Sequence, residues 1–166
     1  MPVVPFEHFS SLVPAGARLL GLDVGSKRIG LALSDETRTV ATADRVLERT
    51  RYAGDLERLS ALCAEHGVGG IVVGLPVSMD GRQGPQCQRV QQFARDLLVR
   101  IDLPLAFWDE RLSTAAVERM LIREADLSRK RRRAVVDRAA AAYILQGALD
   151  AMHARRHTLK TAGDGA

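Results

Sequence analysis

The chain has few cysteines, and neither its cysteines nor its histidines follow a pattern that binds zinc. Its two cysteines, Cys63 and Cys87, fall within helix-like stretches, and lone cysteines of this kind are typical of a reducing compartment. The histidines are also unevenly scattered, without the spacing of a zinc site: His8, His66, His153 and His157. These absences exclude a disulfide scaffold and a zinc-finger domain.

Long apolar runs are equally scarce. No stretch approaches the roughly 20 apolar residues of a membrane-spanning helix. Residues 1–17 contain three prolines and no basic start followed by an apolar run, so they do not resemble a secretory signal peptide. At 166 residues the chain fits one globular domain with its own hydrophobic core. We therefore expect a cytoplasmic protein of one domain.

The hydrophobic pattern predicts strands first, then alternating helices and strands. Alternation of apolar residues predicts three strands, over 18–24, 29–35 and about 38–47, with a hairpin connection over 25–28. Helical spacing and short apolar runs then predict a helix ending at Gly67, a buried strand over 69–77, a helix opening at Pro85 and a strand over 103–108. The remaining elements are a helix capped by Ser113 or Thr114, a basic loop, and a helix over about 134–152.

This order of elements is that of the ribonuclease H-like fold. We predict an α/β protein with a mixed five-stranded sheet, made of a three-stranded antiparallel meander and two parallel strands, flanked by helices. The domain is expected over residues 18–153. An irregular extension over 1–17 and a flexible polar tail over 154–166 are expected to flank it.

Three acids lie in settings where the surrounding pattern predicts at least partial burial. Asp23 shares a strand face with Gly21 and Gly25, which offer no side-chain donor and leave room for a close approach. Asp137 lies in the first turn of the last predicted helix, beside an apolar face, although the helix dipole alone also favours an acid there. Glu110 follows a predicted strand end, where α/β proteins tend to place functional groups.

The residues alone do not decide whether Glu110 or another acid joins Asp23 and Asp137 at the site. Asp109 is adjacent to Glu110, and Asp80 and Asp35 follow other predicted strands. Arg111 could form a surface ion pair with either Asp109 or Glu110. Buried carboxylates that converge repel one another unless they bind a cation. We therefore predict a site for Mg²⁺ or Mn²⁺, with two ions about 3.5–4 Å apart activating a water for phosphodiester hydrolysis.

Basic residues lie next to these acids. The formal net charge is +4 and the pI is about 9.6. Lys27 and Arg28 follow Asp23, and a consecutive basic run precedes Asp137: Arg129, Lys130, Arg131, Arg132 and Arg133. A basic run by itself is ordinarily a solvated loop. Because both clusters flank candidate ligands, we interpret them, together with Arg111, as contacts for a phosphate backbone.

The chain resembles the YqgF family, whose members are described as RuvX-like Holliday junction resolvases or pre-16S rRNA nucleases. Four segments carry the resemblance in the family's order: GLDVGSKRIGLALSD, IVVGLPVSMDG, DERLSTAAVERML and VVDRAAAAYILQ. The resemblance covers about residues 19–150 and implies a ribonuclease H-like nuclease. It also implies that Asp23, Glu110 and Asp137 are the catalytic and metal-binding acids, and so favours Glu110 over its rivals.

The sequence therefore predicts a metal-dependent endonuclease acting on structured nucleic acid. Its substrate is either the 5′ end of pre-16S rRNA or a Holliday junction in DNA recombination and repair; a resolvase is expected to act as a symmetric homodimer. Aromatic residues make up only 4% of the chain, so extensive base stacking is not expected. Two alternatives are a non-catalytic nucleic-acid-binding module on the same fold and an actin-like nucleotide-binding domain.

Overall fold

The computed structural model describes residues 2–78, 80–112 and 129–163, with the side chains of Leu112 and of residues 129–138 outside that description. The elements in chain order are α1 (Phe6–Leu12), β1 (Arg18–Val24), β2 (Arg28–Ser34), β3 (Ala41–Glu48), α2 (Tyr52–Glu65), β4 (Val68–Leu75), α3 (Pro85–Arg100), β5 (Leu105–Asp109), the 3-10 turn η1 (Glu110–Leu112) and α5 (Arg129–Gly163). Within the described residues, no helix is long and apolar enough to span a bilayer.

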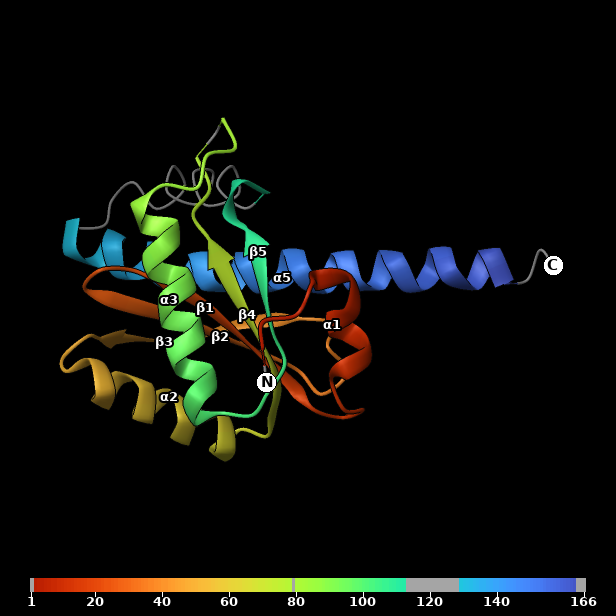
Figure 1. The fold of residues 1–166 in the computed structure, drawn as a ribbon, viewed down its shortest axis with the longest axis horizontal. Helices are drawn as coiled ribbons and strands as arrows, with labels where there is room; N and C mark the ends of the chain where they lie inside the picture. Colours follow the sequence, from red (N-terminus) through yellow and green to blue (C-terminus); the bar gives the residue numbers. More distant parts are fainter. Residues whose placement is uncertain (1, 79, 113–128, 164–166) are drawn as a thin grey trace.

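One mixed sheet organises the chain (Figure 1). Its strand order is β3-β2-β1-β4-β5. The pairs β1–β2 and β2–β3 are antiparallel, whereas β4 pairs parallel with both β1 and β5. The predicted meander with two parallel strands is therefore confirmed. Because β1, β4 and β5 run in the same direction, their carboxyl ends meet at one edge of the sheet.

The two faces of the sheet are covered by different helices. Leu20 and Leu22 of β1 pack with α2 and α3 in one apolar cluster. Leu19 lies on the opposite face with α1 and α5, in a second cluster. This division follows from the period of two along a strand, which sends successive side chains to opposite faces. Asp23, an even number of residues after Leu19, belongs to the α5 face.

Glycine and proline mark helix boundaries where the sequence predicts them. Gly67, just after α2, has a φ of +64°, a left-handed conformation that glycine adopts without steric cost. Pro85 occupies the first turn of α3, where its missing N–H is not needed. Both predictions are confirmed.

Helix α5 lies unusually close to the sheet, because glycines replace side chains at the contact. A Cβ atom added at Gly21 of β1 would lie 2.7 Å from the Cβ of Leu145, and one at Gly147 would lie 3.0 Å from Nε1 of Trp108. The sequence predicts that Gly21, beside Asp23, leaves room for a close approach. In the structure it is α5 that approaches Gly21, through the side chain of Leu145 and the carbonyl of Ala141.

The N-terminal segment is ordered, in contrast to the irregular extension expected over 1–17. Residues Phe6–Leu12 form α1, and Phe9 is completely buried against the sheet. Val3 forms a parallel bridge with Leu105, and the amide of Val4 donates to the Leu105 carbonyl at 2.9 Å. A helix of only seven residues is too short to show a clear period, which explains why the pattern did not reveal it.

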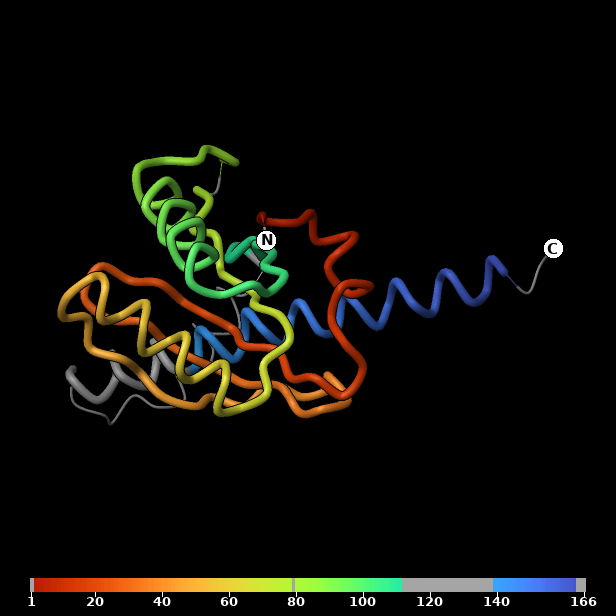
Figure 2. Tube along the Cα trace, turned by 60° about the horizontal axis from the view of Figure 1, so that its bottom comes forward, coloured from red at the N-terminus to blue at the C-terminus, as the bar shows by residue number. Residues whose placement is uncertain are grey.

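The last helix is longer than predicted at both ends. The basic run over 129–133, expected as a loop, forms the first turns of α5. Residues 154–163, expected as a frayed tail, continue the same helix, which extends beyond the sheet in Figures 1 and 2. Arginine, lysine and alanine are strong helix formers, which accounts for both extensions. The helix predicted after Ser113 or Thr114 lies outside the described residues.

Candidate active site

Asp23 and Glu110 meet at the sheet edge where the parallel strands end. Asp23 is the penultimate residue of β1, and Glu110 directly follows β5. The intervening strand β4 has Gly74 at this level, since Leu22 pairs with Val73. A Cβ added at Gly74 would lie 2.7 Å from Oε1 of Glu110. The absence of a side chain at Gly74 therefore lets the Glu110 carboxyl reach across β4 toward Asp23.

The two carboxyl groups are hydrogen-bonded to each other, and the pKa of Glu110 is raised to about 8. Burial is the largest cause, followed by the charge of Asp23 and the hydrogen bond with it. A hydrogen bond between two carboxyl groups requires one shared proton. At neutral pH a cation could replace that proton, because both oxygens would then face positive charge instead of each other. The arrangement fits a hard divalent cation with oxygen ligands.

Asp109 is bound to Arg111 and not to Asp23. It accepts hydrogen bonds from the backbone amide and the guanidinium of Arg111, the closest at 2.6 Å. The Arg111 hydrogen bond is the main cause holding the pKa of Asp109 below its ordinary value. Asp80 is exposed and pairs with Arg82 at 3.3 Å. Of these neighbouring acids, Glu110 is the one that the structure brings to Asp23.

Asp35 lies at the opposite end of the strands from Asp23 and Glu110. It follows β2, which is antiparallel to β1, so it is near the start of β1 and far from its carboxyl end. Its carboxylate closes a turn: the Thr37 hydroxyl and the amides of Val40 and Thr39 donate to it. These bonds hold the pKa of Asp35 well below its usual range.

The side chain of Asp137 lies outside the described residues. Its backbone belongs to α5, four residues and so about one helical turn before Ala141. The carbonyl of Ala141 lies 3.1 Å from the position of a Cβ at Gly21, so this part of α5 is in contact with β1. Among the side chains that the structure describes, no three or more acidic, histidine or cysteine residues form a metal-binding group. The described site thus contains two of the three predicted acids.

The predicted phosphate contacts differ in their environment. Lys27 is exposed in the β1–β2 turn. Arg28 pairs with Glu48 at 3.1 Å, and Arg111 pairs with Asp109 at 2.6 Å. The run over 129–133 is helical, and its side chains lie outside the described residues. The backbone of this run is placed, but its role stays a prediction.

A buried acid on the other face of the sheet was not found from the sequence. Asp55 is 1% exposed, forms an ion pair with Arg58 at 2.6 Å, and has Arg49 at 3.8 Å. An acid in the first turn of a helix is usually explained by the helix dipole, so no local pattern marks it as buried. Its partner Arg49 precedes the helix, and only the fold shows that it turns toward Asp55.

Comparison with known proteins identifies the family of this chain. A sequence profile described as "RuvX: Holliday junction resolvase" matches residues 17–151. The chain belongs to the RuvX family. Proteins named "Putative pre-16S rRNA nuclease" are similar over nearly their full length. The one from Rhodospirillum rubrum is 51% identical over 156 residues, covering 94% of this chain and 97% of that protein. The one from Paramagnetospirillum magneticum is 58% identical over 151 residues, covering 90% and 96%.

Solved structures show the same fold for this RuvX-family chain. RuvC of T. thermophilus, solved in complex with a Holliday junction substrate, aligns with a TM-score of 0.56 at 15% identity, over 83% of this chain and 96% of that one. The Fowlpox virus resolvase, solved with Holliday junction DNA, aligns with a TM-score of 0.52 at 7% identity, over 81% and 98%. The predicted ribonuclease H-like fold and family are therefore confirmed.

Proposed function

We propose that this RuvX-family protein is an endonuclease that hydrolyses phosphodiester bonds of structured nucleic acid with the help of divalent cations. The observation that carries the proposal is the hydrogen-bonded pair of Asp23 and Glu110 at the carboxyl edge of the sheet. Acids are expensive to bring together without a cation, and such perturbed acids concentrate at functional sites. Membership of the RuvX family supports the same reaction class.

The acids have distinct tasks in this proposal. Asp23, fixed on a central strand, and Glu110, held over Gly74, supply carboxylate oxygens as ligands, and Asp137 supplies the third carboxylate. Bound Mg²⁺ or Mn²⁺, by our expectation two ions, supplies Lewis acidity to the water and to the departing oxygen. Glu110 would give up its shared proton on becoming a metal ligand, so cation binding and proton release would be coupled. Lys27 contributes an exposed positive charge for the phosphate backbone.

The substrate is the second part of the proposal. The curated relatives are named for pre-16S rRNA, and the family for Holliday junctions. Both are structured nucleic acids recognised largely through their backbone. Processing of an rRNA precursor requires a cytoplasmic protein, in keeping with the expectation from the sequence. Resolution of a junction requires paired cuts, and so a homodimer.

The test compares cleavage of a four-way DNA junction and of a pre-16S rRNA fragment, in Mg²⁺, in Mn²⁺ and in EDTA. We expect Asp23→Asn and Glu110→Gln to lose at least about a hundredfold in rate, as removal of key charge-stabilising groups commonly does. The control is Asp35→Asn, the same chemical change at the opposite edge of the sheet. Equal losses in all three variants, or undiminished cleavage in EDTA, would contradict the proposal. Binding without cleavage in every condition would support the non-catalytic alternative.

A further inference from the structure

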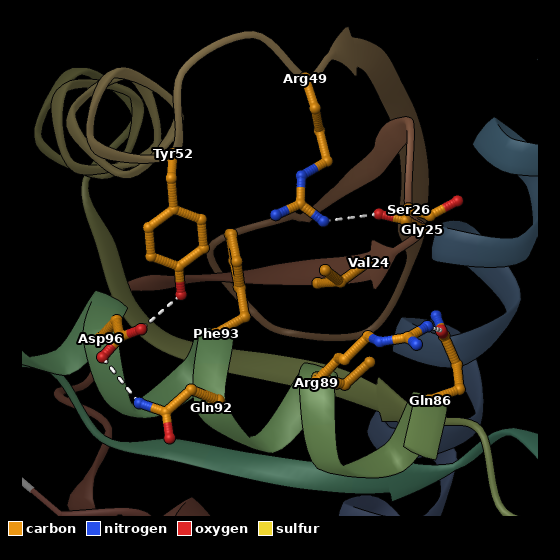
Figure 3. Close-up of a pocket in the computed structure, with 11 residues that line it drawn as sticks. Val24, Gly25, Ser26, Arg49, Tyr52, Gln86, Arg89, Gln92, Phe93 and Asp96 are labelled. Atoms are coloured by element: carbon orange, nitrogen blue, oxygen red, sulfur yellow. Dashed lines mark hydrogen bonds between the residues drawn. The ribbon is translucent and has the colours of Figure 1, made fainter. Parts of the chain in front are cut away.

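Two adjoining hollows open beside the β1–β2 turn, on the α2 and α3 side of the sheet. Figure 3 shows the residues that line the first of them. Their volumes are about 340 Å³ and about 620 Å³. They share four lining residues: Ser26, Arg49, Tyr52 and Arg89. The walls come from the β1–β2 turn, the segment that joins β3 to α2, the start of α2, and α3, which are distant in sequence and adjacent in the fold.

Arg49 is held in place at the junction of these hollows. Its Nη1 donates to the carbonyl oxygen of Gly25 at 2.8 Å, and its guanidinium carbon lies 5.3 Å from the ring centroid of Phe93. Its Nε lies 3.8 Å from the buried carboxylate of Asp55. Asp55 also accepts hydrogen bonds from Arg58 and from the Thr50 amide. A cation fixed in this way loses little side-chain entropy when it binds an anion.

The acids around the hollows already have partners. Glu48 pairs with Arg28 at 3.1 Å, and the Asp96 carboxylate accepts from the Tyr52 hydroxyl and from Nε2 of Gln92. Asp55 is occupied by its arginines. Among the described residues, neither Lys27 nor Arg89 has a carboxylate partner; Arg89 makes a long hydrogen bond of 3.4 Å to Gln86. The described charged side chains at the hollows that lack a partner of opposite charge are therefore positive.

The hollows lie close to the acid pair along the chain. Val24, Gly25 and Ser26 directly follow Asp23, and each lines the first hollow. Asp23 and Val24 project to opposite faces of the sheet, because side chains alternate along β1. A strand rises only about 3.3 Å per residue, so Asp23 and Val24 are close along β1. The acid pair and the hollows therefore lie on opposite faces of the sheet, near the same end of β1. An extended polyanion that crosses this edge would contact both.

We propose that the paired hollows bind a backbone phosphate of the substrate strand that flanks the scissile phosphodiester. Arg49, Arg89 and Lys27 supply the positive charge, and Asp55 is a positioning residue for Arg49. The strand crosses the carboxyl edge, with its scissile phosphate at Asp23 and Glu110 and a neighbouring phosphate in the hollows. This contact sets which bond faces the acids, without reading base sequence. The inference rests on the proposed function, because it assumes a nucleic-acid strand at the acid pair.

Binding of a fluorescent single strand and of a four-way junction, measured against salt concentration, tests the inference. All proteins carry Asp23→Asn, so that cleavage does not disturb the measurement. We expect added Arg89→Gln to weaken binding roughly three- to tenfold near 0.1 M salt. It should reduce the slope of log affinity against log salt by about 0.7 for the single strand and about 0.9 for the junction, the value of one phosphate contact.

The matched control is Arg95→Gln, the same change at an exposed position of the same helix that lines neither hollow. It should leave the slope unchanged. A set of strands with one uncharged methylphosphonate at successive positions then locates the contact. One position near the scissile bond should weaken binding to the parent protein, and should weaken binding to the Arg89→Gln protein less, because only Arg49 and Lys27 then remain to contact that phosphate. Inorganic phosphate at millimolar concentration should compete only weakly, since it lacks the second contact.

The outcomes separate this inference from the proposed function. Equal slopes for Arg89→Gln and Arg95→Gln, with the wild-type protein cleaving normally, would overturn the phosphate site alone. A wild-type protein that never cleaves, yet shows the expected slope difference, would contradict the nuclease while supporting the site. Absence of nucleic-acid binding by the parent protein would overturn both. In a nuclease, cut positions should also spread to neighbouring bonds when Arg89→Gln is introduced alone.

Discussion

The carboxyl groups of Asp23 and Glu110 form a hydrogen bond with each other across β4, although Asp23 lies on β1 and Glu110 directly follows β5. This contact depends on Gly74, whose missing side chain leaves the path between them open. Asp23 is fixed within a paired strand, whereas Glu110 begins the short η1 turn. One carboxyl group is therefore held on a paired strand, and the other is attached where the backbone leaves the sheet.

Removal of divalent cations should make stability depend on pH through Glu110. Its pKa is about 8 in the folded protein and 4.5 ordinarily. The folded state thus binds the proton more tightly, so the stabilisation is complete below about pH 4.5 and is lost as pH rises toward about 8. Denaturant unfolding in EDTA should show a loss of about 1–2 kcal/mol between pH 5 and 8, less than full linkage because the pair is partly solvated.

Glu110→Gln is the control for that measurement, because it keeps the shape and removes the titration. Its unfolding free energy should be flatter over the same range. Excess Mg²⁺ should also flatten the wild-type profile, since a cation replaces the shared proton. Parallel profiles for wild type and variant would show that Glu110 does not titrate as the structure indicates.

Gly74→Ala should disturb the site without removing any acid. Its Cβ would lie 2.5 Å from Cδ1 of Ile144 and 2.7 Å from Oε1 of Glu110. We expect a loss of about 1–3 kcal/mol in stability from overpacking, and a loss of at least about tenfold in cleavage from the displaced carboxyl. In Gly54→Ala the added Cβ reaches only ordinary contact with Arg51, at 4.0 Å. That control should gain about 0.4–1 kcal/mol.

Asp55→Asn should destabilise the fold by about 2 kcal/mol at pH 7, because a buried carboxylate with charged partners is replaced by a neutral amide. Burial alone would raise the pKa of Asp55, but the Thr50 amide and Arg58 outweigh it and lower the pKa. The stabilisation is therefore present above the ordinary pKa of 3.8 and is lost as pH falls below it. Thermal unfolding at pH 7 and pH 3 measures the difference, which should shrink at pH 3.

Glu57→Gln supplies the comparison for Asp55, since its side chain is 72% exposed and its ion pair with Arg100 is at the surface. Its effect should stay within about 0.5 kcal/mol. An Asp55 variant no less stable than the Glu57 variant would mean that the buried ion pair adds nothing.

Phe9→Ala should show that the N-terminal segment belongs to the core. Phe9 is completely buried, and its truncation is expected to cost about 3–5 kcal/mol in the free energy of unfolding. Leu12→Ala in the same helix is the control, because Leu12 is 43% exposed. Chemical denaturation compares the two. A similar small loss in both variants would mean that α1 is only loosely attached in solution.

The sequence was sufficient for the parts of the fold that depend on local pattern. Alternation identified the meander, and Gly67 and Pro85 marked helix ends, because these signals arise within a few residues. It did not reveal α1, whose burial depends on contacts with distant β5. It also placed the run over 129–133 in a loop, since a row of cations resembles a solvated segment more than the start of a helix.

The sequence indicated which acidic residues to consider for the candidate site, but not how their side chains are arranged in space. The structure brings Asp23 and Glu110 together, the second having been chosen through family resemblance, and their role as catalytic acids stays a prediction. The reason that Asp109 is unsuitable is its bond to Arg111, two residues away, and several pairings of these side chains were possible. Gly21 indicated a close approach beside Asp23, but a glycine does not show what comes close, and only the structure identifies α5 there. Asp137 stays a prediction.

The bridge between Val3 and Leu105 has a consequence for synthesis on the ribosome. Val3 precedes Leu105 in the chain by about a hundred residues, so it leaves the ribosome well before its partner. The hydrogen bond from the amide of Ala41 to the side chain of Gln146 in α5 similarly joins residues 105 positions apart. Contacts between distant residues form slowly, and their apolar surfaces stay exposed meanwhile. Phe9 is therefore expected to remain accessible to chaperones until β5 has emerged, so that α1 docks well after it has been made.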